Sequence, residues 1–134
     1  MISQETDNEE EIEVLYNDCY GKWAISNKAK ELYALRKMNN NNKCRRRSDP
    51  ILIQIYNDLG DDFDDKKCST TKIEKIPKKY ENYYFISEYD GLETVEIDYT
   101  KYQLDILKQK IKEILEENSI NNDEKINQFK NLVI

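Results

Sequence analysis

The stretch Cys19-Tyr20-Gly21 is the first place where residue types and spacing could support chemistry. It follows an apolar run and precedes a helix-like stretch. Backbone N–H groups at such a turn can surround an anion, and a cysteine near a helix start can ionise to a nucleophilic thiolate. A catalytic thiol normally needs a basic partner, and this chain contains no histidine. The structural alternative is a small thiol at the end of a strand.

A second candidate is the run Arg45-Arg46-Arg47, which leads into Asp49-Pro50. Guanidinium groups beside a helix start are unfavourable unless an anion is near, so this pattern indicates a receptor for phosphate or carboxylate. The alternative is that Asp49 caps the helix and partners one arginine, while the acidic loop from Asp61 to Asp65 neutralises the others.

A third candidate is the turn from Glu88 to Glu93, in which Glu88, Tyr89, Asp90 and Glu93 place three carboxylates and a phenol together. Such a group could perform acid–base chemistry without histidine. The same residues are also typical of an ordinary hairpin end.

Two further features favour structural explanations over functional ones. The acidic loop Asp61, Asp62, Asp64 and Asp65 does not have the spacing of a calcium-binding loop, so we interpret it as a solvated charge run. The seam from Leu104 to Ile114 has the 3-4-3 spacing of a buried helix face, although it could also pair between chains.

Composition narrows the class of protein. The chain has 134 residues, a net charge of −6, three cysteines at irregular spacing and no histidine. These numbers exclude a Ser-His-Asp or Cys-His catalytic pair within the chain and disfavour a metal site, a disulfide framework and general nucleic-acid binding. The sequence predicts no cofactor and leaves open whether the protein is an enzyme.

Location is inferred from hydropathy. The mean hydropathy is −0.93, and no apolar run approaches the roughly 20 residues that span a bilayer. The acidic N-terminus lacks the features of a signal peptide. We therefore expect no membrane contact and a cytoplasmic protein.

Periodicity and capping signals predict an α+β order of elements. Alternation and aromatic residues indicate strands, Asp90-Gly91 is a turn signal for a connection longer than two residues, and Ser26, Asp49 and a Thr100–Gln103 capping box mark helix starts. The expected strands span 11–16, 72–76, 83–89 and 94–98, and the expected helices span 27–38, 50–59, 100–118 and a short segment after Asp123.

We expect a small mixed sheet of about four strands that is covered by helices, with a helical C-terminus. The expected organisation is a disordered acidic tail over residues 1–10, a single α+β domain over 11–118 and a helical extension over 119–134.

Several of these stretches together resemble a family of small uncharacterised proteins of giant DNA viruses and tailed phages. The resemblance covers about residues 12–98, and Lys22-Trp23 takes the place of a Gly-Phe pair in the family's turn. It implies a viral accessory protein of the host cytoplasm or the virion, and it implies no reaction. The motifs that carry it are Asp18-Cys19-Tyr20-Gly21, Arg47-x-Asp49-Pro50, Leu59-Gly60, Lys72-Ile73-x-x-Ile76-Pro77 and Glu88-Tyr89-Asp90-Gly91-x-Glu93.

Two functional hypotheses follow. In the first, the turns converge on one sheet edge and bind a phosphate-bearing, nucleotide-like molecule. In the second, the protein is a non-enzymatic interaction or virion-associated protein that meets a protein partner through its acidic surface or C-terminal helices. The residues assigned to the ligand site are Cys19, Tyr20, Gly21, Arg47, Asp49, Glu88, Tyr89, Asp90 and Glu93.

Overall fold

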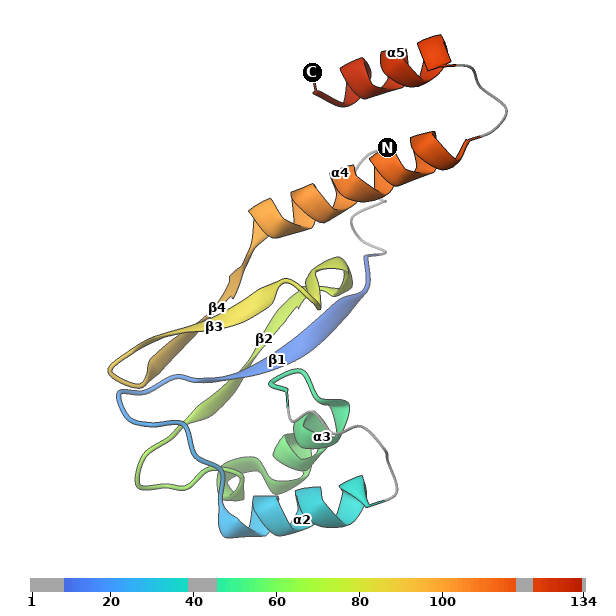
Figure 1. Ribbon diagram of the computed structural model, residues 1–134. Coiled ribbons are helices and arrows are strands. Elements are labelled where there is room, and N and C mark those ends of the chain that lie inside the picture. The colour runs from blue at the N-terminus through green and yellow to red at the C-terminus, as the bar shows by residue number, and fades with distance from the viewer. Residues whose placement is uncertain (1–8, 39–45, 118–121, 134) are drawn as a thin grey trace. The chain divides into compact units, whose positions relative to one another are not determined.

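The computed structural model describes residues 9–38, 46–117 and 122–133. These residues form two compact units, and the boundary between the units in the sequence lies between Ile97 and Asp98 (Figure 1). The first unit contains all four strands, and the second contains the C-terminal helices. The α+β class and the helical C-terminus are therefore confirmed. The division lies at the end of the last strand, whereas we expected it after residue 118.

One strand pair of the first unit joins β1 (Glu11–Asn17) and β2 (Thr71–Pro77), which run antiparallel with Glu11 opposite Pro77 although two α-helices separate them in the sequence. In β1 the side chains of Val14, Leu15 and Asn17 are buried. An apolar strand therefore ends on a buried amide, and this residue becomes the centre of the site described below.

The second pair, β3 (Tyr84–Tyr89) and β4 (Leu92–Ile97), is a tight hairpin with Tyr89 opposite Leu92. Asp90 and Gly91 alone form the loop, and their φ angles are +50° and +90°. Positive φ at both positions matches the twist of the flanking strands, which is why Asp-Gly is favoured there. Our expectation of a longer connection was wrong.

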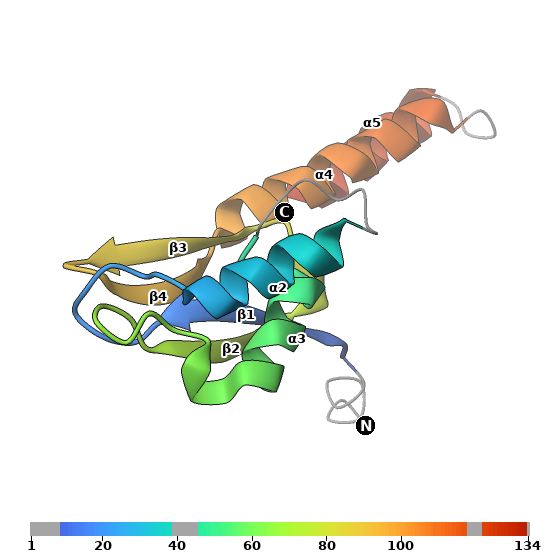
Figure 2. The ribbon, with the colours of Figure 1, turned by 90° about the horizontal axis from the view of Figure 1, so that it is seen from below.

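The four expected strands form two antiparallel pairs instead of one mixed sheet. The reason lies at the edge of β1 that faces away from β2. There, Leu15 N donates to the carbonyl oxygen of Arg47 (2.8 Å), and Asn17 N donates to Glu93 Oε1 (2.8 Å). Because these partners occupy the β1 amides, β4 lies beside β1 without a backbone ladder (Figure 2).

Two helices supply most of the remaining core. Ser26 caps α2 (Asn27–Lys37) and Asp49 caps α3 (Pro50–Leu59), as predicted. Gly60 ends α3 with φ +55° and leads into the short 3-10 helix η1 (Gly60–Asp62); a second, η2 (Lys78–Tyr80), follows β2. The core cluster comprises Leu15, Ile25, Ala29, Tyr33, Leu52, Ile53, Ile55 and Phe63.

The second unit consists of α4 (Tyr99–Glu116) and α5 (Asn122–Val133). Asp98 caps α4 by accepting from Lys101 N (3.0 Å), so the predicted capping box at Thr100 was wrong. The carboxylate of Asp98, just before the helix, reaches the amide of the third helical residue and leaves Thr100 inside the helix. Ile114 of the predicted seam is buried, whereas Leu104 is half exposed.

The N-terminal part of the chain is described from Glu9 onward, and residues 1–8 of the expected tail lie outside the described residues. Lys78 N donates to the Glu10 carbonyl (2.9 Å), and the Lys79 amine lies 3.4 Å from Glu9 Oε1. Over the part of the chain that the structure describes, no helix is both long and apolar enough to cross a membrane.

Candidate functional site

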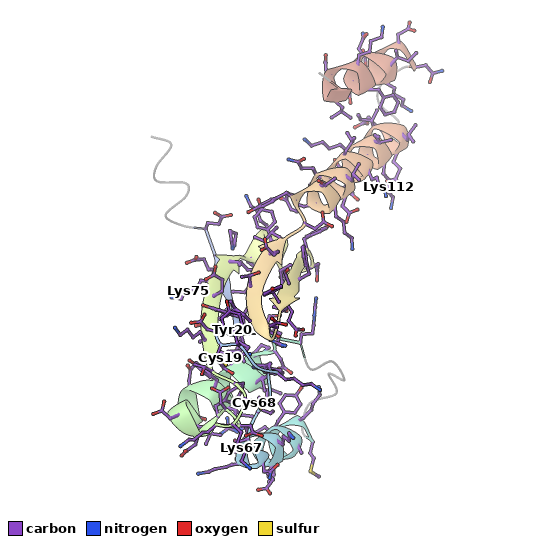
Figure 3. All side chains as sticks on the ribbon, turned by 90° about the vertical axis from the view of Figure 1, so that its left-hand side faces the viewer. Cys19, Tyr20, Lys67, Cys68, Lys75 and Lys112 are labelled. Atoms are coloured by element: carbon purple, nitrogen blue, oxygen red, sulfur yellow. The ribbon has the colours of Figure 1, made fainter. Side chains whose placement is uncertain are left out.

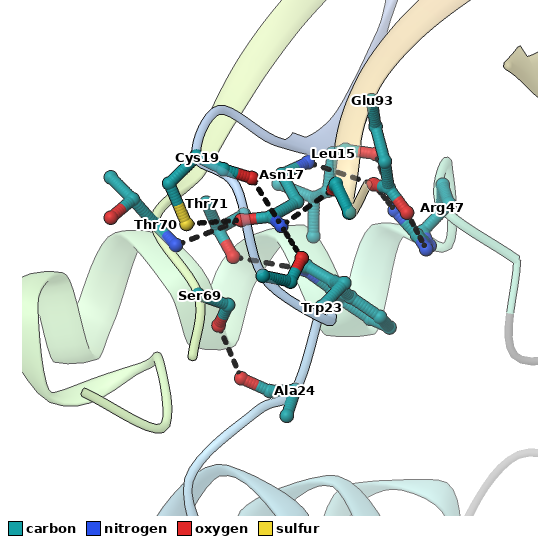
Figure 4. A network of polar contacts seen from close by, with 12 residues as sticks. Leu15, Asn17, Cys19, Trp23, Ala24, Arg47, Ser69, Thr70, Thr71 and Glu93 are labelled. Atoms are coloured by element: carbon teal, nitrogen blue, oxygen red, sulfur yellow. Dashed lines mark hydrogen bonds and ion pairs between the residues drawn. The ribbon is translucent and has the colours of Figure 1, made fainter. Parts of the chain in front are cut away.

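The predicted turns meet around a residue that sequence reasoning missed, Asn17 at the end of β1 (Figure 4). Its side chain is fully buried. Asn17 Nδ2 lies within hydrogen-bonding distance of the carbonyl oxygens of Cys19 (3.1 Å), Gly21 (2.8 Å) and Gly91 (2.9 Å). Asn17 Oδ1 accepts from Thr70 N (2.9 Å). One amide therefore links the Cys19 turn, the hairpin loop and the start of β2.

Arg47 and Glu93 come together as the second part of this network. Arg47 Nη1 lies 2.5 Å from Glu93 Oε1, and Nη2 lies 2.9 Å from Oε2. The guanidinium carbon also sits 3.8 Å from the ring centroid of Trp23. A fork-shaped cation is well suited to pair with a carboxylate through two donors while stacking on an aromatic ring. The predicted convergence of Arg47 and Glu93 is thus present, with each as the partner of the other.

Two glycines allow the Cys19 turn to contact the hairpin loop directly. Gly21 N donates to the Asp90 carbonyl (3.1 Å). A Cβ on Gly91 would lie 1.8 Å from Gly21 O, and a Cβ on Gly21 would lie 2.5 Å from Cys68 O. Only glycine permits such close backbone approach, so both positions have a packing reason for their residue type.

Cys19 behaves as a structural donor in this network. Its thiol lies 3.2 Å from Asn17 Oδ1 and 3.7 Å from the Cys68 carbonyl, and both cysteines are free thiols. The neighbouring Asp18 accepts from the Lys72 amine at 2.6 Å, and this hydrogen bond raises the pKa of Lys72. These contacts fix the turn to β2 and supply no base for the thiol.

Asp49, two residues from Arg47, faces a different part of the molecule. Its Oδ1 accepts from Ile51 N (2.9 Å), and its Oδ2 accepts from the Tyr33 hydroxyl (2.6 Å). Lys37 in turn donates to that hydroxyl (2.7 Å). Burial, followed by the hydrogen bond to Asp49, raises the pKa of Tyr33. Asp49 therefore caps α3 and does not join Arg47 in one site.

The remaining predicted residues are exposed around the same turns. Tyr20 and Tyr89 are 71% and 73% exposed, and Glu88 is also at the surface (Figure 3 shows Tyr20). Glu88 lies directly opposite Glu93 in the hairpin register. Apart from Asp49, the predicted residues thus divide into a buried network and an exposed rim.

The acidic loop is organised through Asp64, which is a structural residue. Asp64 accepts from Thr71 N (2.8 Å), from the Ser69 hydroxyl (2.8 Å) and from the Thr71 hydroxyl. Trp23 Nε1 donates to the same Thr71 hydroxyl (3.0 Å), so this loop is connected to Arg47 through Trp23. Over residues 9–38, 46–117 and 122–133, no three acidic or cysteine side chains gather as a metal site would require.

Two surface hollows among the described residues lie away from this network. One, of about 520 Å³, lies between α4 and α5 and includes Ile114 and Leu132. Another, of about 430 Å³, lies beside Asp64 and Thr71. Neither of these two hollows is lined by Cys19, Arg47 or Glu88.

Of the predicted arginine run, Arg45 lies outside the described residues, and Arg47 is the member that joins the network. Sequence reasoning did not select Asn17 and Trp23, because neither residue lies in a motif that is typical of a binding or catalytic site. A signal existed in each case: Asn17 is an amide residue that directly follows the predicted strand 11–16, and Trp23 is the only tryptophan of the chain.

No family model matches this chain, and searches of curated proteins and of solved structures likewise found no match. The resemblance to proteins of giant viruses and phages therefore stays a prediction.

Proposed function

We propose that this chain is a non-enzymatic protein-interaction protein, the second of the two hypotheses that the sequence raised. The observation that carries the proposal is the Arg47–Glu93 pair. The guanidinium that was expected to hold a phosphate already binds a carboxylate through both terminal nitrogens and stacks on Trp23. An incoming phosphate would have to replace a buried partner, which is unfavourable because Glu93 would lose its cation.

A surface suited to protein binding lies on the outer face of the β3–β4 hairpin. Glu93 points toward Arg47, so residues on the opposite face of the hairpin point away from the network. On that face Phe85 is 50% exposed and Tyr89 is 73% exposed. Exposed aromatic residues on a rigid element are typical of interface anchors.

Tyr20 is a further exposed aromatic residue, and it lies on the turn that contacts the hairpin loop. Its backbone is fixed because Gly21 bonds to the Asp90 carbonyl and because Asn17 bonds to Gly21 and Gly91. The buried network therefore holds Tyr20 and the hairpin in one arrangement, which lowers the entropy lost on binding. In this proposal the buried network positions Tyr20 and the hairpin for contact with the partner protein.

The proposal includes a viral setting, in which the protein acts as an accessory protein in the host cytoplasm or the virion. The resemblance of the turn motifs to proteins of giant DNA viruses and tailed phages supports this part. The C-terminal helices add a further candidate surface, because Leu104, Leu115 and Ile126 are at least half exposed.

A binding assay with small molecules separates the two hypotheses. Purified protein is heated with inorganic phosphate, ATP, GTP or a dinucleotide, and the unfolding temperature is recorded. A ligand that binds the folded state raises its unfolding temperature. Because Arg47 already pairs with Glu93, we expect none of these compounds to raise it. A rise with any of these compounds that disappears in Arg47→Lys would overturn the proposal.

The interaction itself is tested with a double variant, Tyr20→Ser with Tyr89→Ser, and with Leu35→Ser on α2 as the control. Leu35 is 66% exposed and lies away from the hairpin. Proteins that the wild-type protein captures are purified, and their binding to wild type, double variant and control is then measured with purified components alone. We expect the double variant to lose binding and the control to keep it; equal binding by both would contradict the proposed surface.

A further inference from the structure

We propose that the outer edge of β3 binds an extended, lysine- or arginine-rich segment of a partner protein, which joins the hairpin as a third strand. This inference rests on the proposed protein-binding function and names the chemistry of the partner. The argument uses the backbone register of the hairpin, the side chains at its edge and its charge.

The register leaves one side of β3 without a strand partner in the part of the chain that the structure describes. β3 pairs with β4, and β4 lies between β3 and β1 (Figure 2). Next to a two-residue loop the closing pair exchanges backbone hydrogen bonds, and further pairs alternate. Tyr89, Ser87 and Phe85 therefore bond to β4, whereas the backbone groups of Tyr84, Ile86 and Glu88 point outward.

No described residue outside the hairpin forms a backbone hydrogen bond with residues 84–89. The outward groups can supply a donor and an acceptor from each of three alternate residues. This is the arrangement that a peptide uses when it adds a strand to a sheet.

The far edge of β2 shows how this chain protects another edge. Thr71 is occupied there, because its amide donates to Asp64 and its carbonyl accepts from the Tyr56 hydroxyl (3.1 Å). β2 also carries Lys72 and Lys75 and ends at Pro77, which has no N–H. Lysine and proline are the usual devices against edge-to-edge pairing. β3, with the sequence YFISEY, contains neither.

Charge indicates the kind of segment that fits this edge. Between Tyr84 and Ile97 the chain has acidic residues at 88, 90, 93 and 96 and no lysine or arginine. Glu93 is neutralised by Arg47, which leaves the carboxylates of Glu88, Asp90 and Glu96 to attract cations. Phe85 and Tyr89 on the outer face add aromatic rings over which a cation can lie. The complementary strand is therefore cationic.

The test uses the full chain and an eight-residue peptide that alternates lysine and valine, with blocked ends and a fluorescent label. We expect saturable binding that weakens as salt rises, because exposed charges are screened. Two control peptides have the same length: one alternates glutamate and valine, and one carries an N-methyl group on every backbone amide, so that neither of its edges can donate. Neither control should bind, since the first repels the edge and the second cannot pair.

Two substitutions of Glu88 separate the contribution of the backbone N–H to peptide affinity from the contribution of the carboxylate charge. Glu88→Pro removes an outward N–H, which β4 does not use, and we expect it to lower peptide affinity at least about tenfold. Glu88→Gln keeps the N–H and should lower affinity only about two- to fivefold. Ser87→Pro removes an N–H that bonds to β4, so it serves as the reference for a broken hairpin.

Amide hydrogen exchange of the wild-type complex provides a measurement that does not depend on any variant. Bound peptide should slow exchange at Tyr84, Ile86 and Glu88. Binding of the N-methylated peptide as tightly as the parent, unchanged exchange at these amides, or no binding of the lysine–valine peptide would each overturn the inference. If partners still require Tyr20 and Tyr89 in that case, the proposed function stands and only this mode of binding falls.

Discussion

Arg47 and Glu93 form a two-point ion pair, with Nη1–Oε1 at 2.5 Å and Nη2–Oε2 at 2.9 Å, although 46 positions separate them in the sequence. The Glu93 side chain is only 6% exposed. The pair joins the loop before α3 to the start of β4. Glu93 also accepts from Asn17 N, so this one carboxylate holds three segments of the chain together.

Removing the charge of Glu93 should destabilise the first unit. Glu93→Gln leaves a partly buried guanidinium without its anion, and we expect the free energy of unfolding to fall by about 2 kcal/mol or more. Urea unfolding, followed by the fluorescence of Trp23, measures the change. Glu96→Gln on the same strand is exposed and should change the free energy by less than about 0.5 kcal/mol. Equal effects of the two substitutions would show that the pair contributes little.

Gly91 should tolerate no side chain. Gly91→Ala would place a Cβ 1.8 Å from Gly21 O at a residue with φ +90°, so we expect a loss of about 3 kcal/mol or more. Gly60→Ala is the matched control, because φ is +55° there and no atom lies within 4 Å of the added Cβ. That substitution adds backbone strain alone, at φ +55° and ψ −121°, and should cost about 1–3 kcal/mol. Thermal unfolding of both variants is sufficient, and a Gly91 variant as stable as the Gly60 variant would contradict the contact.

Asn17→Asp should create a pH-dependent defect. The new carboxylate would face the carbonyl oxygens of Cys19, Gly21 and Gly91, where the amide now donates. Burial and these oxygens would raise the pKa of the introduced group, so the variant approaches wild-type stability below about pH 4 and loses it as pH rises. The measured quantity is the difference in unfolding free energy from wild type across pH 3–8. A constant difference would argue against the buried amide contacts.

Tyr33 should contribute to alkaline unfolding. Its pKa is raised first by burial and then by the hydrogen bond to Asp49, so the folded state holds this proton more tightly than the unfolded state. Stability from this group is complete below about pH 10 and falls as pH rises beyond it. We therefore expect the advantage of wild type over Tyr33→Phe to be about 1 kcal/mol at neutral pH and to shrink above pH 10. Leu35→Ala, which removes no titrating group, should show a constant difference over the same range.

Local signals were sufficient for most elements. Ser26, Asp49-Pro50 and Gly60 marked helix ends correctly because a cap uses backbone groups within a few residues of itself. Alternating apolar residues located β1 for the same reason. The Thr100 capping box failed where two acceptors competed within one turn, since the sequence does not show which of them reaches the free amide.

The site was predicted only in outline. Arg47, Glu93 and the Cys19 turn lie at the ends of predicted helices and strands, and the sequence analysis selected them for that reason. The structure brings these residues into one network. Whether they leave space between them could not be inferred, because a guanidinium and a carboxylate far apart in sequence can share a ligand or bind each other. Asn17 was missed because two partners of its side chain, Gly91 and Thr70, lie 74 and 53 positions away in the sequence.

The sequence by itself determined the α+β class, the caps of α2 and α3, the position of the Asp90-Gly91 turn and the absence of histidine chemistry, since these depend on composition and on contacts within a few residues. Only the tertiary structure decided that the strands form two pairs and that Arg47 binds Glu93. Those outcomes depend on which distant groups occupy the outer amides of β1, and the distance between such groups is fixed by the packing of the whole unit.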